Sequence, residues 1–209
     1  MHRFRLGSSV VLIVAVMTAL LGCAPVIETA VRDRELPVEG VSRERIAIVL
    51  DTSRLERTSD AADLARLKDS LERELASSGG FRQYRVVIDA PSADHEPVRA
   101  TVALTRLDYV KQGMRFPPAP PLELACLAPV VAPMLFERNY LRLEVTAQAE
   151  LLVQDREGTV TGRTFVSESA TGRADFFASG EGKAATVLQD IAFRNFSGQV
   201  VRELLFLTR

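Results

Sequence analysis

The stretch YLRLEVTAQAELLVQ, residues 140–154, alternates apolar and polar side chains with a period of two. Every second residue from Leu141 to Val153 is apolar, the residues between them are polar, and Leu152 is the exception. This alternation predicts a long β-strand in a sheet that has one covered face and one wetter face. A sheet is therefore expected at the centre of the fold.

The residues that follow continue the same sheet. Asp155-Arg156-Glu157-Gly158 has the composition of a hairpin turn, so residues 159–172 are expected to return as the partner strand. In that strand the alternation places Val160 and Val166 on one face and Phe165 on the other. The two strands and their turn predict a long antiparallel hairpin.

Earlier in the chain, a strand, a helix and a second strand follow one another. The run IAIVL, residues 46–50, is apolar throughout, as in a strand that is buried on both faces. A leucine stripe predicts a helix over residues 60–77, and Gly79-Gly80 is expected to end it. The stripe consists of Leu64, Leu67, Leu71 and Leu75. Residues 84–88, YRVVI, predict a second strand parallel to the first.

The remaining elements complete a two-layer fold. Residues 98–110 predict a long strand, and residues 183–206 predict a final helix in which Gly198 would allow a bend or a break. The expected class is α/β (α+β), with the element order β-α-β-β-β-β-α and about five strands in a mixed sheet. Both helices are expected on one face of that sheet, in a single domain over residues 44–209.

Composition excludes several classes of function. The 209 residues are 47% hydrophobic and 25% charged, which is typical of a globular chain, and the formal net charge is −1. That balance argues against general nucleic-acid binding, which needs a clustered basic excess. Two Cys and two His are too few for a zinc cluster or an iron–sulfur centre, so no metal and no cofactor are expected.

The N-terminus has the pattern of a leader. Met1 to Arg5 carries two arginines, and residues 10–21, VVLIVAVMTALL, form an apolar run of twelve broken only by Thr18. A basic segment followed by such a run is typical of a secretory signal peptide. A single membrane-spanning anchor is the alternative, but the run is short of the ~20 residues that a bilayer requires.

The end of this leader carries the most specific motif of the chain. Leu20, Leu21, Gly22 and Cys23 resemble the lipobox of bacterial lipoproteins. The resemblance implies removal of residues 1–22, with covalent diacylglycerol and an N-acyl chain on Cys23. Ala24 follows the cysteine, which implies the periplasmic face of the outer membrane. The alternative is an ordinary secretory cleavage beside a coincidental cysteine.

Cleavage would change the chain that remains. It leaves 187 residues with a net charge of −3, because Arg3 and Arg5 are lost with the leader. Cys126 would be the only free thiol, expected to be buried, with an intermolecular disulfide as the alternative. Residues 23–43 are expected to form a lipidated, flexible tether that reaches at most about 65 Å when extended.

One segment does not fit the two-layer pattern. Residues 113–137 contain six prolines, which exclude a regular strand or a long helix, yet the segment is strongly apolar. A long apolar loop of this kind suggests a contact site for a protein or a membrane. Its candidate partner-binding residues are Met114, Phe116, Leu122, Leu124, Met134 and Phe136. The alternative is a loop that folds back and buries these side chains in its own domain.

The sequence offers no recognisable catalytic constellation. His95 would need a nucleophile and an orienting acid nearby, and none of Ser53, Ser167 and Ser169 lies in a nucleophile-elbow pattern. Asp94-His95-Glu96 is unsuited to metal binding because adjacent side chains of an extended segment point to opposite sides. The acidic residues around the predicted turn, Glu150 among them, are interpreted as solvated. We therefore expect a protein that is not an enzyme.

The order of elements resembles a group of envelope lipoproteins. The segments 45–50 and 84–89, with the leucine-striped helix between them, look like the start of the periplasmic α/β domain of curli-secretion and penicillin-binding-protein-activator lipoproteins. The later strands, the hairpin and the helix from Ala184 extend the resemblance to about residue 206, and the proline-rich insert departs from it. The resemblance implies a non-enzymatic protein that binds and supports other envelope machines.

These observations predict a membrane-anchored periplasmic lipoprotein that acts as an accessory or docking subunit of a cell-envelope complex, in secretion, peptidoglycan assembly or outer-membrane assembly. The alternative is a lipid- or glycolipid-handling auxiliary that uses the apolar insert as its lip. The expected partners are the membrane, through the lipid anchor, and an envelope protein complex. No nucleic-acid partner is expected, and oligomerisation is left open.

Overall fold

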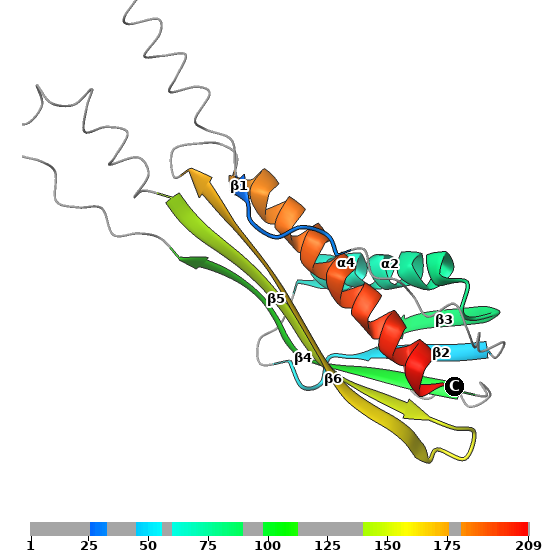
Figure 1. Cartoon of the computed structure of the whole chain (residues 1–209). Helices are drawn as coiled ribbons and strands as arrows, with labels where there is room; N and C mark the ends of the chain where they lie inside the picture. The colour runs from blue at the N-terminus through cyan, green and yellow to red at the C-terminus, as the bar shows by residue number, and fades with distance from the viewer. Residues whose placement is uncertain are drawn as a thin grey trace, which may run out of the picture.

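A mixed β-sheet with two helices on one face forms the domain (Figure 1). The structure, a computed structural model, describes residues 26–32, 45–55, 60–89, 98–112, 140–175 and 181–208. Five long strands and the two helices follow one another in the order β-α-β-β-β-β-α, which confirms the predicted fold class. A two-residue strand before them adds a sixth member to the sheet.

The sheet combines a parallel half with an antiparallel half. Its strands are β1 (Val26–Ile27), β2 (Arg45–Asp51), β3 (Gln83–Ile88), β4 (Val98–Gln112), β5 (Tyr140–Gln154) and β6 (Val160–Asp175). Their spatial order is β1-β6-β5-β4-β2-β3. Strand β2 is parallel to both of its neighbours, and all other pairs are antiparallel. The 15-residue strands β4 and β5 make the antiparallel half roughly 50 Å long.

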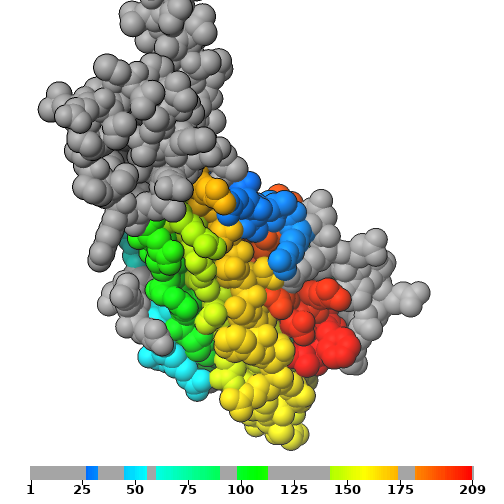
Figure 2. All heavy atoms as spheres, turned by 60° about the vertical axis from the view of Figure 1, so that its left-hand side comes forward, coloured from blue at the N-terminus to red at the C-terminus, as the bar shows by residue number. Residues whose placement is uncertain are grey.

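The N-terminal segment 26–32 belongs to the domain. It begins as β1, whose Val26 pairs with Arg173 and whose Ile27 pairs with Gly172 on the edge of β6. In Figure 2 it is the blue segment that lies beside the end of β6. These seven residues fall within the range that the sequence predicted to be a tether, because two residues of strand carry no detectable period. We call residues 26–32 the strap.

Helix α2 (Ala61–Ser78) is capped at both ends by adjacent residues. Asp60 caps its N-terminus by accepting a hydrogen bond from the N–H of Ala62 at 3.1 Å. Gly79 ends it in the left-handed region, at φ 61°, where a residue without Cβ is favoured. Three leucines of the predicted stripe, Leu67, Leu71 and Leu75, are buried against the sheet and the second helix.

Helix α4 (Glu181–Leu207) crosses the sheet beside α2 (Figure 1). It continues through Gly198 without a break. Its C-terminal end rests on the hairpin, where a Cβ at Gly162 would lie 2.8 Å from the Leu207 side chain. Glycine at position 162 therefore lets the helix end approach the backbone of β6 closely.

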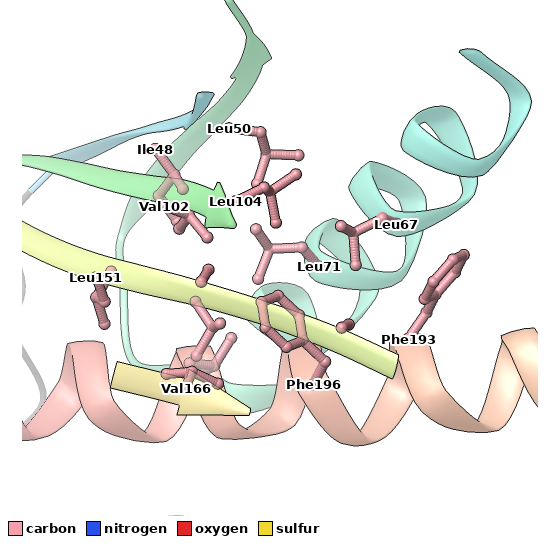
Figure 3. Packing of buried hydrophobic residues seen from close by; sticks show 14 of the residues in the cluster. Ile48, Leu50, Leu67, Leu71, Val102, Leu104, Leu151, Val166, Phe193 and Phe196 are labelled. Atoms are coloured by element: carbon pink, nitrogen blue, oxygen red, sulfur yellow. The ribbon is translucent and has the colours of Figure 1, made fainter. Parts of the chain in front are cut away.

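One hydrophobic core lies between the helices and the sheet (Figure 3). The sheet contributes fully buried side chains such as Ile48 and Leu104, and the helices contribute Leu71, Phe193 and Phe196. The alternation in β5 holds as predicted, since the described apolar residues from Leu143 to Val153 on its core side are all buried. The core thus occupies one face of the sheet only.

The predicted placement of Val160 was wrong. Val166 is buried and Phe165 is exposed, as the alternation requires, but Val160 is 51% exposed. A register shift explains the difference, because Val153 pairs with Gly162 while Gln154 pairs with Val160, which leaves Thr161 as an extra residue. One additional residue in a strand moves every position beyond it to the opposite face.

Candidate functional site

The site residues predicted from sequence lie outside the described part of the chain. This applies to Leu20, Leu21, Gly22 and Cys23 in the leader, and to Met114, Phe116, Leu122, Leu124, Met134 and Phe136 in the insert. His95 and Cys126 also lie outside it. Their proposed roles remain predictions, and the candidate site below is built from the described residues.

The strap is held by hydrogen bonds to its backbone. The side chain of Asn195 on α4 accepts from the N–H of Arg32 at 2.9 Å and donates to the carbonyl of Ala30 at 3.2 Å. On the sheet side, the N–H of Glu28 donates to the carbonyl of Thr171, and the hydroxyl of Thr29 accepts from the N–H of Thr171 at 2.8 Å. The strap is therefore bonded both to α4 and to the edge strand β6.

Strand pairing places the start of the strap at one defined end of the sheet. Val26 pairs with Arg173, Arg173 with Arg142, and Arg142 with Gln112. These four residues form one row across β1, β6, β5 and β4, which we call the N-terminal row. Three strand spacings of ~4.8 Å make it about 14 Å wide. Gln112 directly precedes the proline-rich insert, so the insert leaves the sheet at the same end as the N-terminal segment.

The face of the sheet opposite the helices is polar. Neither of the two described helices lies on this face, which we call the open face (Figure 1). In its middle, β5 and β6 present small or uncharged side chains, namely Gln148, Ser167, Ser169 and Thr171, and Thr146 on the same side of β5 is buried. Ser167 accepts a hydrogen bond from the amide of Gln148 at 3.2 Å, a contact that orders the surface.

A three-residue ion network lies on the open face. The carboxylate of Glu150 accepts from Arg54 at 2.7 Å through one oxygen and from Arg163 through the other. Its side chain is only 13% exposed, whereas Arg54 and Arg163 are 56% and 71% exposed. Desolvation would raise the pKa of Glu150, but the hydrogen bonds and charges of Arg163 and Arg54 outweigh it and lower the pKa. The interpretation of Glu150 as simply solvated was therefore wrong.

Apolar side chains accompany this network. Phe165, which pairs with Glu150 across the strands, is 56% exposed, and Val160 is exposed four residue pairs further along. Leu152 lies beside them on β5, half-buried, and pairs with Arg163. Leu152 is the exception to the alternation of β5. It lies on the open face, where it adds an apolar side chain beside Phe165 and Val160. An exposed aromatic ring beside two extended guanidinium groups is typical of protein-binding surfaces.

A polar crevice of about 550 Å³ opens where β2 and β3 end. It is lined by Val49, Asp51, Thr52, Ser53, Asp89, Arg99 and Thr101. Both oxygens of Asp89 accept from Thr52, one from its N–H at 2.8 Å and the other from its hydroxyl at 2.5 Å. Hydrogen bonds from the hydroxyl and the N–H of Ser53 lower the pKa of Asp51.

These contacts give the crevice a structural role. Asp89 has a φ of 47°, which is uncommon for a residue with a side chain, and its bonds to Thr52 hold it in that conformation. Open α/β sheets often bind ligands at this position, beyond the carboxyl ends of parallel strands. Here the carboxylates are already committed to the two loops, so the crevice is a weaker candidate than the open face.

Few side chains in the described part of the chain are arranged for catalysis or metal binding. Within the ranges that the structure describes, no three His, Cys, Asp or Glu side chains gather as metal ligands. No helix in those ranges has the length and apolar character needed to cross a bilayer. Ser53 contributes its N–H to Asp51, and Ser167 is bonded to Gln148, so both serines have contacts that are structural.

Comparison with known proteins gives likenesses in structure only. No family model matches the chain, and no curated protein matches it. A minor lipoprotein from Acinetobacter baumannii is 12% identical, with a TM-score of 0.46, over 79% of this chain and 93% of that one. Uncharacterized lipoprotein B from Nitrosomonas europaea is 11% identical, with a TM-score of 0.38, over 85% and 88%. PelC from Paraburkholderia phytofirmans, solved as a dodecamer, is 16% identical, with a TM-score of 0.30, over 80% and 96%.

Proposed function

We propose that the chain is a lipoprotein of the cell envelope, lipidated at Cys23 on the periplasmic face of the outer membrane, which acts without catalysis by docking a partner protein on its open face. The leader and the residues around Cys23 support the anchor. The docking role is supported above all by the strap, because it joins the anchored end of the chain to one end of a sheet roughly 50 Å long.

This arrangement changes the expected reach of the domain. A free tether over residues 23–43 would let the domain stand far from its membrane. With Val26 already paired to β6, only two residues lie between Cys23 and the sheet, and three Cα–Cα steps span at most ~11 Å. The domain would therefore stay close to the bilayer, with the rest of the open face extending away from it toward a partner.

The partner surface that fits the open face is acidic and apolar. Arg54 and Arg163 extend over Glu150 and leave their guanidinium groups accessible, so an approaching protein meets positive charge first. Phe165, the cross-strand partner of Glu150, supplies an exposed apolar anchor next to this network. A buried aromatic ring surrounded by charge-assisted hydrogen bonds contributes most of the affinity in many interfaces.

Photo-crosslinking in cells that express the full chain tests this proposal. A crosslinking residue at Phe165 should capture one protein, and the yield should fall several-fold when Arg163→Glu reverses the charge beside it. Phe206 on α4, also exposed, is the control position. Arg194→Glu is the control reversal, because Arg194 is likewise exposed and paired with a carboxylate, Glu74, at 3.5 Å.

Other outcomes contradict the proposal in distinct ways. Equal capture at Phe165 and Phe206, or no effect of Arg163→Glu, rules out the open face as the docking surface. Capture of lipid would favour the lipid-handling alternative, and capture of a second copy would show self-association. Separately, unchanged acyl labelling and membrane fractionation in Cys23→Ala would refute the lipid anchor.

A further inference from the structure

The outer edge of β6 is paired at one end only. Among the described residues, β1 pairs with Gly172 and Arg173, and the strap takes up both main-chain polar groups of Thr171. Beyond Thr171 the strap leaves the edge, because its next main-chain bonds go to Asn195 on α4. In Figure 2 the strap, in blue, accordingly lies beside only the upper end of β6.

The bonds at Thr171 show which main-chain groups of β6 point outward. Both its N–H and its C=O are directed away from β5 and toward the strap. Successive residues of a strand direct these groups to opposite sides, and the pairing of β6 with β5 has no register shift from 162 to 171. The outward groups are therefore those of Arg163, Phe165, Ser167 and Ser169. These four N–H and four C=O groups have no partner among the residues that the structure describes.

The side chains of this stretch leave its edge accessible. All four outward residues are exposed on the open face, and two of them, Ser167 and Ser169, are small. Proteins often protect a sheet edge with proline, lysine or a bulge. Residues 162–170 contain neither proline nor lysine, and the bulge at Thr161 lies beyond the end of the stretch. A regular and exposed edge of this kind is a template for another strand.

The helix side of the edge favours a single extended segment over a second copy of the chain. Leu207 lies over Gly162, and Arg32 of the strap contacts the buried carboxylate of Glu168 at 3.5 Å. If two copies paired antiparallel about Phe165, Gly162 of one would lie opposite Glu168 of the other. The end of α4 in one copy would then meet the strap of the other. The chain that follows the strap leads to β2, three strands away from β6.

We propose that the outer edge of β6, from Gly162 to Ala170, takes an extended segment of the docked partner as an added strand, antiparallel as β1 is. This inference rests on the proposed docking role and names how the partner is held. Main-chain hydrogen bonds supply affinity in this mode, and alternate side chains supply specificity. The segment would place an apolar residue opposite Phe165. An acidic residue would lie opposite Arg163, which bonds to Glu150 through Nε and has further N–H donors.

Backbone methylation of a peptide tests the proposed pairing on the full, unmodified chain. The probe is the fluorescein-labelled peptide Thr-Ser-Thr-Ser-Leu-Thr-Asp, which sets leucine opposite Phe165 and aspartate opposite Arg163 in antiparallel pairing. Methyl groups on the main-chain nitrogens of its third, fifth and seventh residues remove donors that face β6. We expect binding, measured by fluorescence anisotropy, to weaken about fivefold for each donor removed. The matched control is methylated at the second, fourth and sixth residues, which face away, and should bind as the unmodified peptide does.

A proline at the same edge tests the pairing in cells. Ser167→Pro removes one outward N–H and leaves the ladder between β6 and β5 intact, as is typical of prolines in edge strands. With the crosslinking residue at Phe165, we expect the yield of the captured protein to fall at least fivefold. Ser167→Ala is the control, because it loses the same side-chain bond to Gln148 and keeps the N–H. Circular dichroism verifies that both variants are folded.

The outcomes separate this inference from the docking role on which it rests. If Phe165 captures a protein equally in the proline and alanine variants, the partner docks without joining the sheet, and only this inference fails. If Phe165 captures nothing while the peptides bind in the expected order, the docking role fails and the edge still accepts a strand. Capture of a second copy, equal weakening by both sets of methyl groups, or no binding of the unmodified peptide overturns the inference.

Discussion

The side-chain amide of Asn195 accepts a hydrogen bond from the backbone N–H of Arg32 at 2.9 Å, across 163 positions of the sequence. The same amide donates to the carbonyl of Ala30. Because both bonds go to the main chain, Asn195 holds the C-terminal part of the strap to α4 independently of the side chains at positions 30 and 32. This contact decides where the N-terminal segment meets the domain.

Asn195→Ala should release the strap. We expect the free energy of unfolding to fall by about 1–3 kcal/mol, since a backbone donor and acceptor lose their buried partner. Urea denaturation measures the change. In a chain from which residues 26–32 are deleted, the same substitution should cost almost nothing. An equal cost in both backgrounds would mean that Asn195 serves α4 rather than the strap.

Glu150→Gln should weaken the pH dependence of stability. The pKa of Glu150 is lower in the folded chain than in the unfolded chain, so its ionisation stabilises the fold above the unfolded pKa. That contribution is lost as the pH falls through the folded pKa, and the glutamine variant should not show this loss. Urea midpoints measured across the range of carboxyl titration test the expectation. NMR should show the pKa of Glu150 rising in Arg163→Gln, and an unchanged value would contradict the network.

Asp63→Asn should change the pH dependence of stability in the direction opposite to Glu150→Gln. Desolvation raises the pKa of Asp63 in the first turn of α2, although Arg66 partly offsets the effect. Its ionisation therefore opposes folding as the pH rises through the unfolded pKa and beyond. Relative to the unmodified chain, the asparagine variant should gain stability between acidic and neutral pH. A loss over that interval would show that the charge helps the helix more than burial penalises it.

Phe196→Ala should remove a large part of the core. Phe196 is 1% exposed between α4 and the sheet, and truncation of such a ring costs about 3–5 kcal/mol. Phe206→Ala, on the same helix at a position that is 65% exposed, should change stability by less than about 0.5 kcal/mol. Denaturant unfolding of both variants compares the two sites. Similar costs would mean that Phe206 is covered in solution, for instance by a partner.

Replacement of Gly79 and of Gly182 by alanine should change the stability of the domain in opposite directions. A Cβ at Gly79 or at Gly182 would meet no atom within 4 Å, so crowding plays no part at either position. Gly79 has a φ of 61°, where a Cβ costs roughly 1–2 kcal/mol, so Gly79→Ala should destabilise the domain. Gly182 lies in the first turn of α4, where alanine is the better helix former, so Gly182→Ala should add up to ~1 kcal/mol. Thermal unfolding distinguishes the two signs.

The regular elements could be predicted because their signals are local. The period of two in residues 140–154 and the spacing of Leu67, Leu71 and Leu75 each state which face of an element is buried. The same holds for the apolar run of β2, where five consecutive residues are buried on both faces. Element order, fold class and most of the core followed from these patterns.

The candidate site could not be predicted in the same way. Arg54 and Glu150 are 96 positions apart, and they meet only because β2 and β4 are neighbours and β4 pairs with β5. The one available signal was Leu152, the apolar residue on the polar side of the alternation, which marked the open face as more than a solvated surface. The sequence showed on which face of its strand a residue lies, but it did not show which residue of the neighbouring strand pairs with it.

The sequence by itself determined the strands, the helices, the covered face of the sheet and the lipoprotein-like leader, since each depends on residues that are close in the chain. Tertiary structure alone decided that Val26 and Ile27 join β6, that Thr161 shifts the register and exposes Val160, and that Arg142 faces Arg173. Side-chain periodicity describes which face of an element is apolar, whereas strand pairing is selected by the packing of the whole chain. The proposed docking surface depends on that pairing.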